Sequence, residues 1–170
     1  MAGTYVHMKT PPAVSRMGGS QQKMFICPYD EITTLQDPTL FKVTSAHTVV
    51  ATKGFVEVYV TKNTGEFMEE LLGGPDRHSF LAKGKFYHPG EADDILAFHN
   101  QVIHERFIIL FPLPGSTELI QIGSKEFQAE IKPTYSTTTN SGDGRGVSFE
   151  FECYMPALIK YTAGTIPMKS

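Results

Sequence analysis

The sequence has no tryptophan, only two cysteines and no long apolar run. Two cysteines cannot supply the disulfide framework of a small secreted domain or a cysteine-rich metal site. The longest apolar run, residues 107–111, has the length of a strand, whereas a membrane helix requires ~20 apolar residues. The N-terminus shows no basic segment followed by an apolar one, so we expect no signal peptide and assembly in the cytoplasm.

The sequence also lacks a strong excess of positive or negative charge. The formal net charge is −3 at pH 7, and lysines and arginines form no cluster. Binding to nucleic acid through counterion release needs a basic surface, which this composition does not favour. A mildly acidic chain could instead line a channel for a polyanion, since repulsion from the wall would prevent binding there. The same charge is also ordinary for a soluble protein.

Catalytic motifs are missing as well. The sequence contains no G-x-S-x-G elbow and no P-loop, and the glycine-rich segment 142–146 lacks the lysine of a phosphate loop and predicts a turn. His99 and His104 are five residues apart, which on a helix separates them by about 140° and disfavours a zinc site. We therefore expect no enzyme, no metal and no cofactor.

The strongest pattern in the chain lies between Glu118 and Tyr161. Segments 119–122 and 127–131 read as strands, the second ending at Pro133, and 134–146 reads as a polar hairpin tip. Residues 147–153 alternate without a break, which places Val147, Phe149, Phe151 and Cys153 on one dry face. Such alternation is typical of an antiparallel sheet. It also predicts a buried thiol at Cys153, and Cys27 is expected to be buried too.

The rest of the chain reads as further strands with one clear helix. We expect a helix over 91–104, because Glu91, Asp93 and Asp94 suit the positive end of a helix dipole. A shorter helix capped by Thr64 is predicted over 63–72, and a hairpin turn at Lys53–Gly54. The remaining strands are expected at 23–28, 40–52 with a break at 45–47, 55–61, 79–88, 106–112 and 117–123.

These elements predict a mainly β fold, a two-sheet sandwich or barrel of about eight strands with one flanking α-helix. We expect one domain over residues 1–170, in which residues 1–22 form an extended N-terminal arm. Gly84 is expected to mark a bulge or a close backbone approach. The glutamates at 57, 118, 126, 130, 150 and 152 fall opposite the apolar positions, on a polar face.

A family resemblance enters with the order of segments "IG", "KEFQAEI", a Ser/Thr-rich linker, "GDGRG" and "VSFEFECYMPALIKY". This order resembles the C-terminal half of phage tail tube (major tail) proteins, over residues 80–165. The expected helix at 91–104 falls where the helix of that family does. The resemblance implies a virion structural protein of the phage tail, assembled in the host cytoplasm.

The resemblance also implies partners. Subunits would form stacked rings, hexameric by the family pattern, around a channel that conducts DNA without specific binding. Tape measure, terminator and sheath proteins would be further partners. The loops 36–54 and 135–146 are candidates for reaching the next ring. The candidate interface residues are Tyr5, Val6 and Met8 in the arm and Tyr135, Asp143 and Arg145 in the hairpin.

Other functions stay open at this point. A tail terminator, adaptor or hub protein would share the fold. A ligand-binding β-sandwich, such as a carbohydrate-binding module, is an alternative, although such modules usually expose tryptophan. A small enzyme on a β-barrel would need a polar cluster in a pocket, which the sequence does not indicate.

Overall fold

The computed structural model describes residues 5–12 and 16–170, which form twelve strands, one α-helix and two short 3-10 helices. The strands are β1 (Lys23–Pro28), β2 (Ile32–Thr34), β3 (Lys42–Val43), β4 (Thr48–Val49), β5 (Val56–Tyr59), β6 (Glu66–Leu72), β7 (Ser79–Pro89), β8 (Phe107–Pro112), β9 (Leu119–Ile122), β10 (Glu130–Ser136), β11 (Gly146–Met155) and β12 (Ile159–Tyr161). The helices are η1 (Tyr29–Glu31), α1 (Asp93–Gln101) and η2 (Val102–His104).

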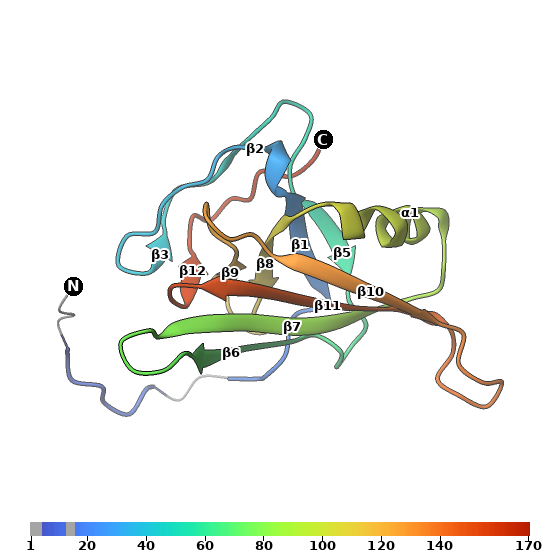
Figure 1. The fold of residues 1–170 in the computed structure, drawn as a ribbon, viewed down its shortest axis with the longest axis horizontal. Coiled ribbons are helices and arrows are strands. Elements are labelled where there is room, and N and C mark those ends of the chain that lie inside the picture. The colour runs from blue at the N-terminus through green and yellow to red at the C-terminus, as the bar shows by residue number, and fades with distance from the viewer. Residues whose placement is uncertain (1–4, 13–15) are drawn as a thin grey trace.

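Two large sheets make up the molecule. A six-stranded sheet has the order β3-β12-β9-β8-β1-β5, and a four-stranded sheet has the order β10-β11-β7-β6. A small sheet of β2 and β4 stands beside them. Figure 1 shows the four-stranded sheet crossing in front of the six-stranded one, with α1 at one end. The protein is therefore a mainly β sandwich with one flanking helix, as the sequence predicts.

The core lies between the two sheets. Val147, Phe149, Phe151 and Cys153 are buried, whereas Ser148 and Glu150 are exposed, so the predicted alternation of β11 is confirmed. Phe149 stacks on Phe86 of β7, and Phe67 of β6 meets Phe111 of β8 across the sandwich. Both cysteines are free and buried, as expected, and burial raises the pKa of each thiol to about 12.

The helix closes one end of the sandwich. Ile95 and Val102 are buried, and Phe98 contacts both Phe107 of β8 and Phe149 of β11. These three positions follow the helical period, and they let α1 seal the gap between the two sheets. His99 is half-buried and His104 is exposed.

The segment between β2 and β5 covers the six-stranded sheet. Leu35, Val43 and His47 are buried in it. The backbone N–H of Gln36 donates to Nδ1 of His47 (2.9 Å), so Nε2–H of the same ring donates to Oε1 of Gln121 in β9 (2.8 Å). These two bonds fix His47 as a neutral ring that joins the covering segment to the sheet.

The predicted helix over 63–72 is wrong. Glu66–Leu72 is strand β6, paired with β7 along its whole length from Glu66↔Lys85 to Leu72↔Ser79. Asn63 has a φ of 63° and Thr64 N–H donates to Thr61 O (3.2 Å), so the chain turns there and returns beside β7. Pairing with a long neighbouring strand overrides the moderate helix propensity of this segment.

Three further details differ from the prediction. The chain makes no hairpin at Lys53–Gly54, because β4 pairs with β2 and β5 pairs with β1. The predicted strand 40–52 is two short strands, β3 and β4, that lie on either side of the expected break. Strand β10 does not end at Pro133 but continues to Ser136. Pro133 is tolerated because β10 is an edge strand, on which a missing N–H can face outward.

Gly84 marks a close approach, as predicted. A Cβ on Gly84 would lie 2.3 Å from the carbonyl oxygen of Glu66 and 2.5 Å from the ring of Phe151. Only glycine at this position lets the Phe151 ring lie across β7. The ring fills the space in the core that a side chain at position 84 would otherwise occupy.

We expect the stability of the fold to fall at mildly acidic pH because of His47. Burial lowers the pKa of His47, an effect that the Gln121 hydrogen bond partly opposes, while the unfolded chain keeps a value of about 6.5. The contribution of the neutral ring is therefore complete above that pH and is lost as the pH falls through the lowered folded value.

Urea unfolding of the wild type and of His47→Leu at pH 7.5 and pH 5 measures this effect. At pH 7.5 the variant should be less stable by roughly 1–3 kcal/mol, because Gln36 N–H and Gln121 lose their partner. At pH 5 the difference should shrink. A difference that stays constant between the two pH values would show that His47 does not titrate as described.

Candidate functional site

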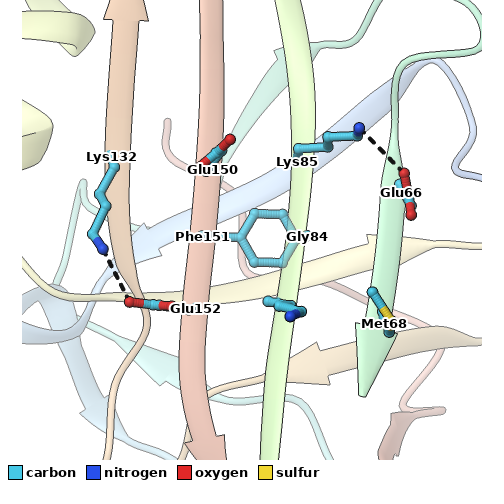
Figure 2. Close-up of a pocket in the computed structure, with 9 residues that line it drawn as sticks. Glu66, Met68, Gly84, Lys85, Lys132, Glu150, Phe151 and Glu152 are labelled. Atoms are coloured by element: carbon cyan, nitrogen blue, oxygen red, sulfur yellow. Dashed lines mark hydrogen bonds and ion pairs between the residues drawn. The ribbon is translucent and has the colours of Figure 1, made fainter. Parts of the chain in front are cut away.

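The outer face of the four-stranded sheet carries a regular pattern of charge. One row crosses all four strands: Lys132 pairs with Glu150, Glu150 with Lys85, and Lys85 with Glu66. Figure 2 shows this row from β10 to β6, with its lysines and glutamates alternating. The neighbouring side chains form ion pairs, Lys85–Glu66 at 3.5 Å and Lys132–Glu152 at 3.1 Å. We call this surface the charged face.

The charged face has a net negative charge. Its charged members, which on β7, β10 and β11 alternate with core-facing residues, are Glu66, Glu70, Lys83, Lys85, Glu130, Lys132, Glu150 and Glu152. Three lysines against five glutamates give 3 − 5 = −2. The Lys132 ammonium donates a hydrogen bond to Glu152, and this bond together with the charges of Glu152, Glu130 and Glu150 raises the pKa of Lys132. Exposed pairs of this kind contribute little to stability, so they determine charge rather than fold.

The charged face contains only a shallow hollow. This hollow has a volume of about 260 Å³ and is lined by lysines, glutamates, Met68, Gly84 and Phe151. No histidine, cysteine or serine lines it, so it holds no nucleophile with a neighbouring base. Within residues 5–12 and 16–170, no cluster of histidine, cysteine, aspartate or glutamate is suited to hold a metal ion.

The two edges of the four-stranded sheet differ in how far they are covered. β6 and β10 are its outermost strands. In the described part of the chain no backbone hydrogen bond reaches the outer side of β6, whereas Ala129, just before β10, exchanges two with Phe107 of β8, and η2 lies beside the first half of β10. Met68 and Leu71 on β6 are 45% and 58% exposed. β6, and the part of β10 beyond η2, therefore present N–H and C=O groups that can pair with a further strand.

Three of the predicted interface residues lie in the N-terminal arm. Tyr5, Val6 and Met8 are 93%, 72% and 91% exposed, on a segment without helix or strand. Residues 1–4 and 13–15 of the predicted arm lie outside the described residues. The arm joins the body at Gln21, whose N–H donates to Pro112 O (3.1 Å) and whose side chain donates to Leu113 O (3.0 Å).

The other three predicted residues belong to the hairpin of β10 and β11. Tyr135 and Arg145 meet at Glu91, just before α1: the Tyr135 hydroxyl donates to Glu91 Oε2 (3.3 Å) and Arg145 Nε lies 2.8 Å from Oε1. Asp143 lies exposed in the connecting loop, residues 137–145, which we call the β10–β11 loop. The structure thus brings Tyr135 and Arg145 together and leaves Asp143 and the arm residues apart.

Sequence reasoning missed the role of Glu91. An acidic residue near a helix start was assigned to the helix dipole, yet the cap position is Ala92 and only Asp93 and Asp94 lie in the first turn. Glu91 instead holds the base of the β10–β11 loop, aided by Gly90 N–H, which donates to Arg145 O (3.1 Å). Its partners are more than forty residues away in the sequence, so no local pattern indicates the contact.

A larger hollow lies between the start of β1 and the β10–β11 loop. Its volume is about 1500 Å³, and its wall combines residues 17–22, the turn 61–66, Lys85–Tyr87 of β7, Pro114 and parts of the hairpin including Asp143. We call it the groove. Its lining contains Lys62 and Lys85 against Glu66, Asp143 and Glu150, a net charge of 2 − 3 = −1.

Comparison with known proteins identifies no relative of this chain. No protein-family model, no curated protein and no solved structure matches the chain significantly. Among the described residues, no helix has the length and apolar composition needed to cross a membrane. The site must therefore be interpreted from its own geometry.

We expect Glu91→Ala to loosen the β10–β11 loop without unfolding the protein. The variant removes the acceptor of both Tyr135 and Arg145, while an exposed ion pair contributes only about 0–1 kcal/mol to stability. Hydrogen exchange of residues 137–145 should become faster, and the melting temperature should change little. The control is Glu105→Ala, since Glu105 is exposed and has no ion pair in the described structure. Equal rates of hydrogen exchange in both variants would argue against a role of Glu91 in holding the loop.

Proposed function

We propose that this protein is a phage tail tube subunit, a non-catalytic component of the virion tail that closes into rings around a DNA-conducting channel. The observation that carries the proposal is the four-stranded sheet, which has one wet, charged face, an open edge at β6 and a partly covered edge at β10. A sheet of this kind is incomplete alone, since an exposed edge favours pairing with another chain. The hollow on the same face is lined by no histidine, cysteine or serine, which agrees with a structural role.

The strand directions allow copies to join head to tail. Each of the three steps β10-β11, β11-β7 and β7-β6 is antiparallel, so β6 and β10 run in opposite directions. β6 of one copy can therefore pair with β10 of the next in the same antiparallel manner as inside the sheet. A contact between two different surfaces generates a ring when the rotation from copy to copy closes on itself, which is the arrangement that we propose.

The charge pattern supports the same junction. The row Lys132, Glu150, Lys85, Glu66 begins with a lysine on β10 and ends with a glutamate on β6. When β6 of one copy lies beside β10 of another, Glu66 can face Lys132, and the alternation continues across the boundary. Opposite charges on directly neighbouring strands are favourable and like charges are not.

The channel wall would then be the charged face. With a net charge of −2 per subunit, it repels the phosphate backbone instead of binding it. DNA would pass without specific contact, and no bond would be made or broken. A terminator, adaptor or hub ring of the tail would use the same edges; stacking of many rings into a tube distinguishes the tube subunit from these.

Purified protein should assemble by itself. We expect negative-stain microscopy to show rings or tubes and sedimentation to show species that grow with protein concentration. The physical reason is that edge pairing satisfies backbone groups that water alone covers in the monomer. A strictly monomeric globule at every concentration tested would contradict the proposal.

A charge exchange tests the junction between β6 and β10. Glu66→Lys and Lys132→Glu should each weaken assembly, because each places like charges across the boundary, and the double variant should recover part of it. Sedimentation measures assembly, and thermal unfolding checks the monomer.

The control for this exchange is Glu57→Lys on β5 of the other sheet. The Glu57 side chain is 54% exposed and paired with a lysine, as Glu66 is at 57%. This variant should assemble like the wild type. If the double variant assembles no better than either single variant, the result would argue against this contact between β6 and β10.

A further inference from the structure

His47 is a buried ring that links the covering segment, residues 35–55, to the six-stranded sheet. It is only 3% exposed. Its Nδ1 accepts the backbone N–H of Gln36 (2.9 Å), and its Nε2–H donates to Oε1 of Gln121 in β9 (2.8 Å). The neutral ring therefore uses both of its nitrogens, one as acceptor and one as donor.

Two aromatic rings lie against His47. The centroid of the Tyr161 ring in β12 is 5.2 Å from that of His47, and the Phe55 ring stacks on His47 with a centroid distance of 6.4 Å. Both rings are almost completely buried. His47 thus contacts the start of the covering segment through Gln36 and its end through Phe55.

Residues 165–169, which we call the strap, are bonded to the same two aromatic residues. The Tyr161 hydroxyl donates to the carbonyl oxygen of the first strap residue (2.6 Å). Phe55 N–H donates to a strap carbonyl oxygen (2.9 Å), and Lys169 N–H donates to the carbonyl oxygen of Phe55 (2.9 Å). In Figure 1 the C-terminal end of the chain accordingly lies near β2, after which the covering segment begins. The strap is therefore attached to the two residues that pack against His47.

Gly54 lets the strap lie close to the covering segment. A Cβ on Gly54 would be 2.5 Å from the carbonyl oxygen of Pro167 and 3.1 Å from the nitrogen of Lys169, and the φ of Gly54 is 140°. Glycine adopts this conformation without strain. The strap and the end of the covering segment are thus packed directly on each other, and loosening one removes support from the other.

A second proton on His47 is incompatible with these contacts. It would place an N–H on Nδ1, so that two donors, this group and Gln36 N–H, would face each other across 2.9 Å. The ring would also carry a charge in a site that water hardly reaches, which is costly unless a partner compensates it. The charged ring therefore favours a conformation in which it is exposed to water.

No negative charge in the described structure compensates a charged His47. Among the side chains in contact with the ring, only Tyr161 is titratable, and burial raises its pKa, so it stays neutral. The pKa of His47 is lowered by burial, an effect that the Gln121 hydrogen bond partly opposes. The carboxylates on or beside the elements around the ring are instead paired with lysines: Glu31 with Lys53, Asp37 with Lys125, and Glu118 with Lys160, near Lys42.

We propose that His47 is an acid-sensitive switch: when its ring takes up a second proton, the covering segment opens at Gln36 and the strap detaches from Phe55, while the two-sheet core stays folded. Opening uncovers the apolar side chains of Leu35 and Phe55, which are buried in the closed form. It also frees the backbone next to β5, where the strap pairs with Phe55. The acid form thus presents an apolar surface and a strand edge that the neutral form covers. This switch is independent of any role in a phage tail.

The direction of the effect follows from the two protonation states. A histidine in water has a pKa of about 6.5, whereas burial lowers the pKa of His47 in the closed form. The proton therefore binds the open form more tightly, and opening becomes more favourable as the pH falls below about 6.5. The increase is roughly 10-fold per pH unit until the closed ring also titrates, so it is at most about 30-fold at pH 5.

Amide hydrogen exchange at pH 7.5 and pH 5, corrected for the intrinsic exchange rates, measures this opening residue by residue. At pH 5 the amides of Gln36, Phe55 and Lys169 should lose protection by up to about 30-fold, whereas the amides paired between β7 and β11 should keep theirs. An equal loss of protection throughout the chain would show a change in global stability alone and would overturn the inference. Unchanged protection at Gln36 and Lys169 would overturn it as well.

His47→Asn tests whether this ring is the cause. Asparagine keeps an acceptor for Gln36 N–H but does not titrate, so the protection of Gln36 and Lys169 should be the same at both pH values. His104→Asn is the matched control, because His104 is exposed and its loss should leave the wild-type pH response unchanged. A pH response that persists in His47→Asn would assign the opening to another group.

The ring proton NMR signals of the wild-type protein give a test that needs no variant at a buried site. Between pH 7.5 and pH 5 the His47 ring should begin to titrate with a midpoint below about 6.5. The signals of the Phe55 and Tyr161 rings should change together with it, because both rings lose their contact with His47. A His47 ring that stays neutral down to pH 5, or that titrates while both neighbouring rings keep their signals, would contradict the switch.

Discussion

The long pairing between β7 and β11 is the interaction on which the rest of the structure depends. Its register runs through ten residue pairs, from Gly146↔Pro89 to Met155↔Phe80. Because side chains alternate along both strands, one register places Phe86, Phe149 and Phe151 in the core and the lysines and glutamates outside. A shift by one residue would exchange the two faces completely. The dry face binds the six-stranded sheet, and the wet face becomes the surface that we propose for the channel.

The same pairing leaves β6 and β10 at the edges. Natural sheets usually protect their edges with short strands, bulges or covering loops. Here each edge strand has seven residues. The β6 edge is uncovered in the described residues, whereas Pro133 and the neighbouring η2 limit the β10 edge. The pattern fits a sheet that is completed by copies of itself.

Sequence patterns predicted the fold class because its main signals are local. The alternation of β11, the acidic start of α1 and the apolar run of β8 each depend on neighbouring residues, and all three are confirmed. β6 was missed because EFMEELL has helix-tolerant residues, and only its position beside β7 makes it a strand. Glu91 and Gln121 were missed for the same reason: their partners, Arg145 and His47, are brought near by the fold alone.

The parallel pairing of β3 with β12 has a consequence for biosynthesis. Lys42 and Val43 lie beside Lys160 and Tyr161, so this pairing cannot form until residue 161 has been translated. Contacts between such distant segments form late, after the entropy of closing the loop has been overcome. A nascent chain on the ribosome therefore leaves β3 unpaired until residues 160 and 161 have been made.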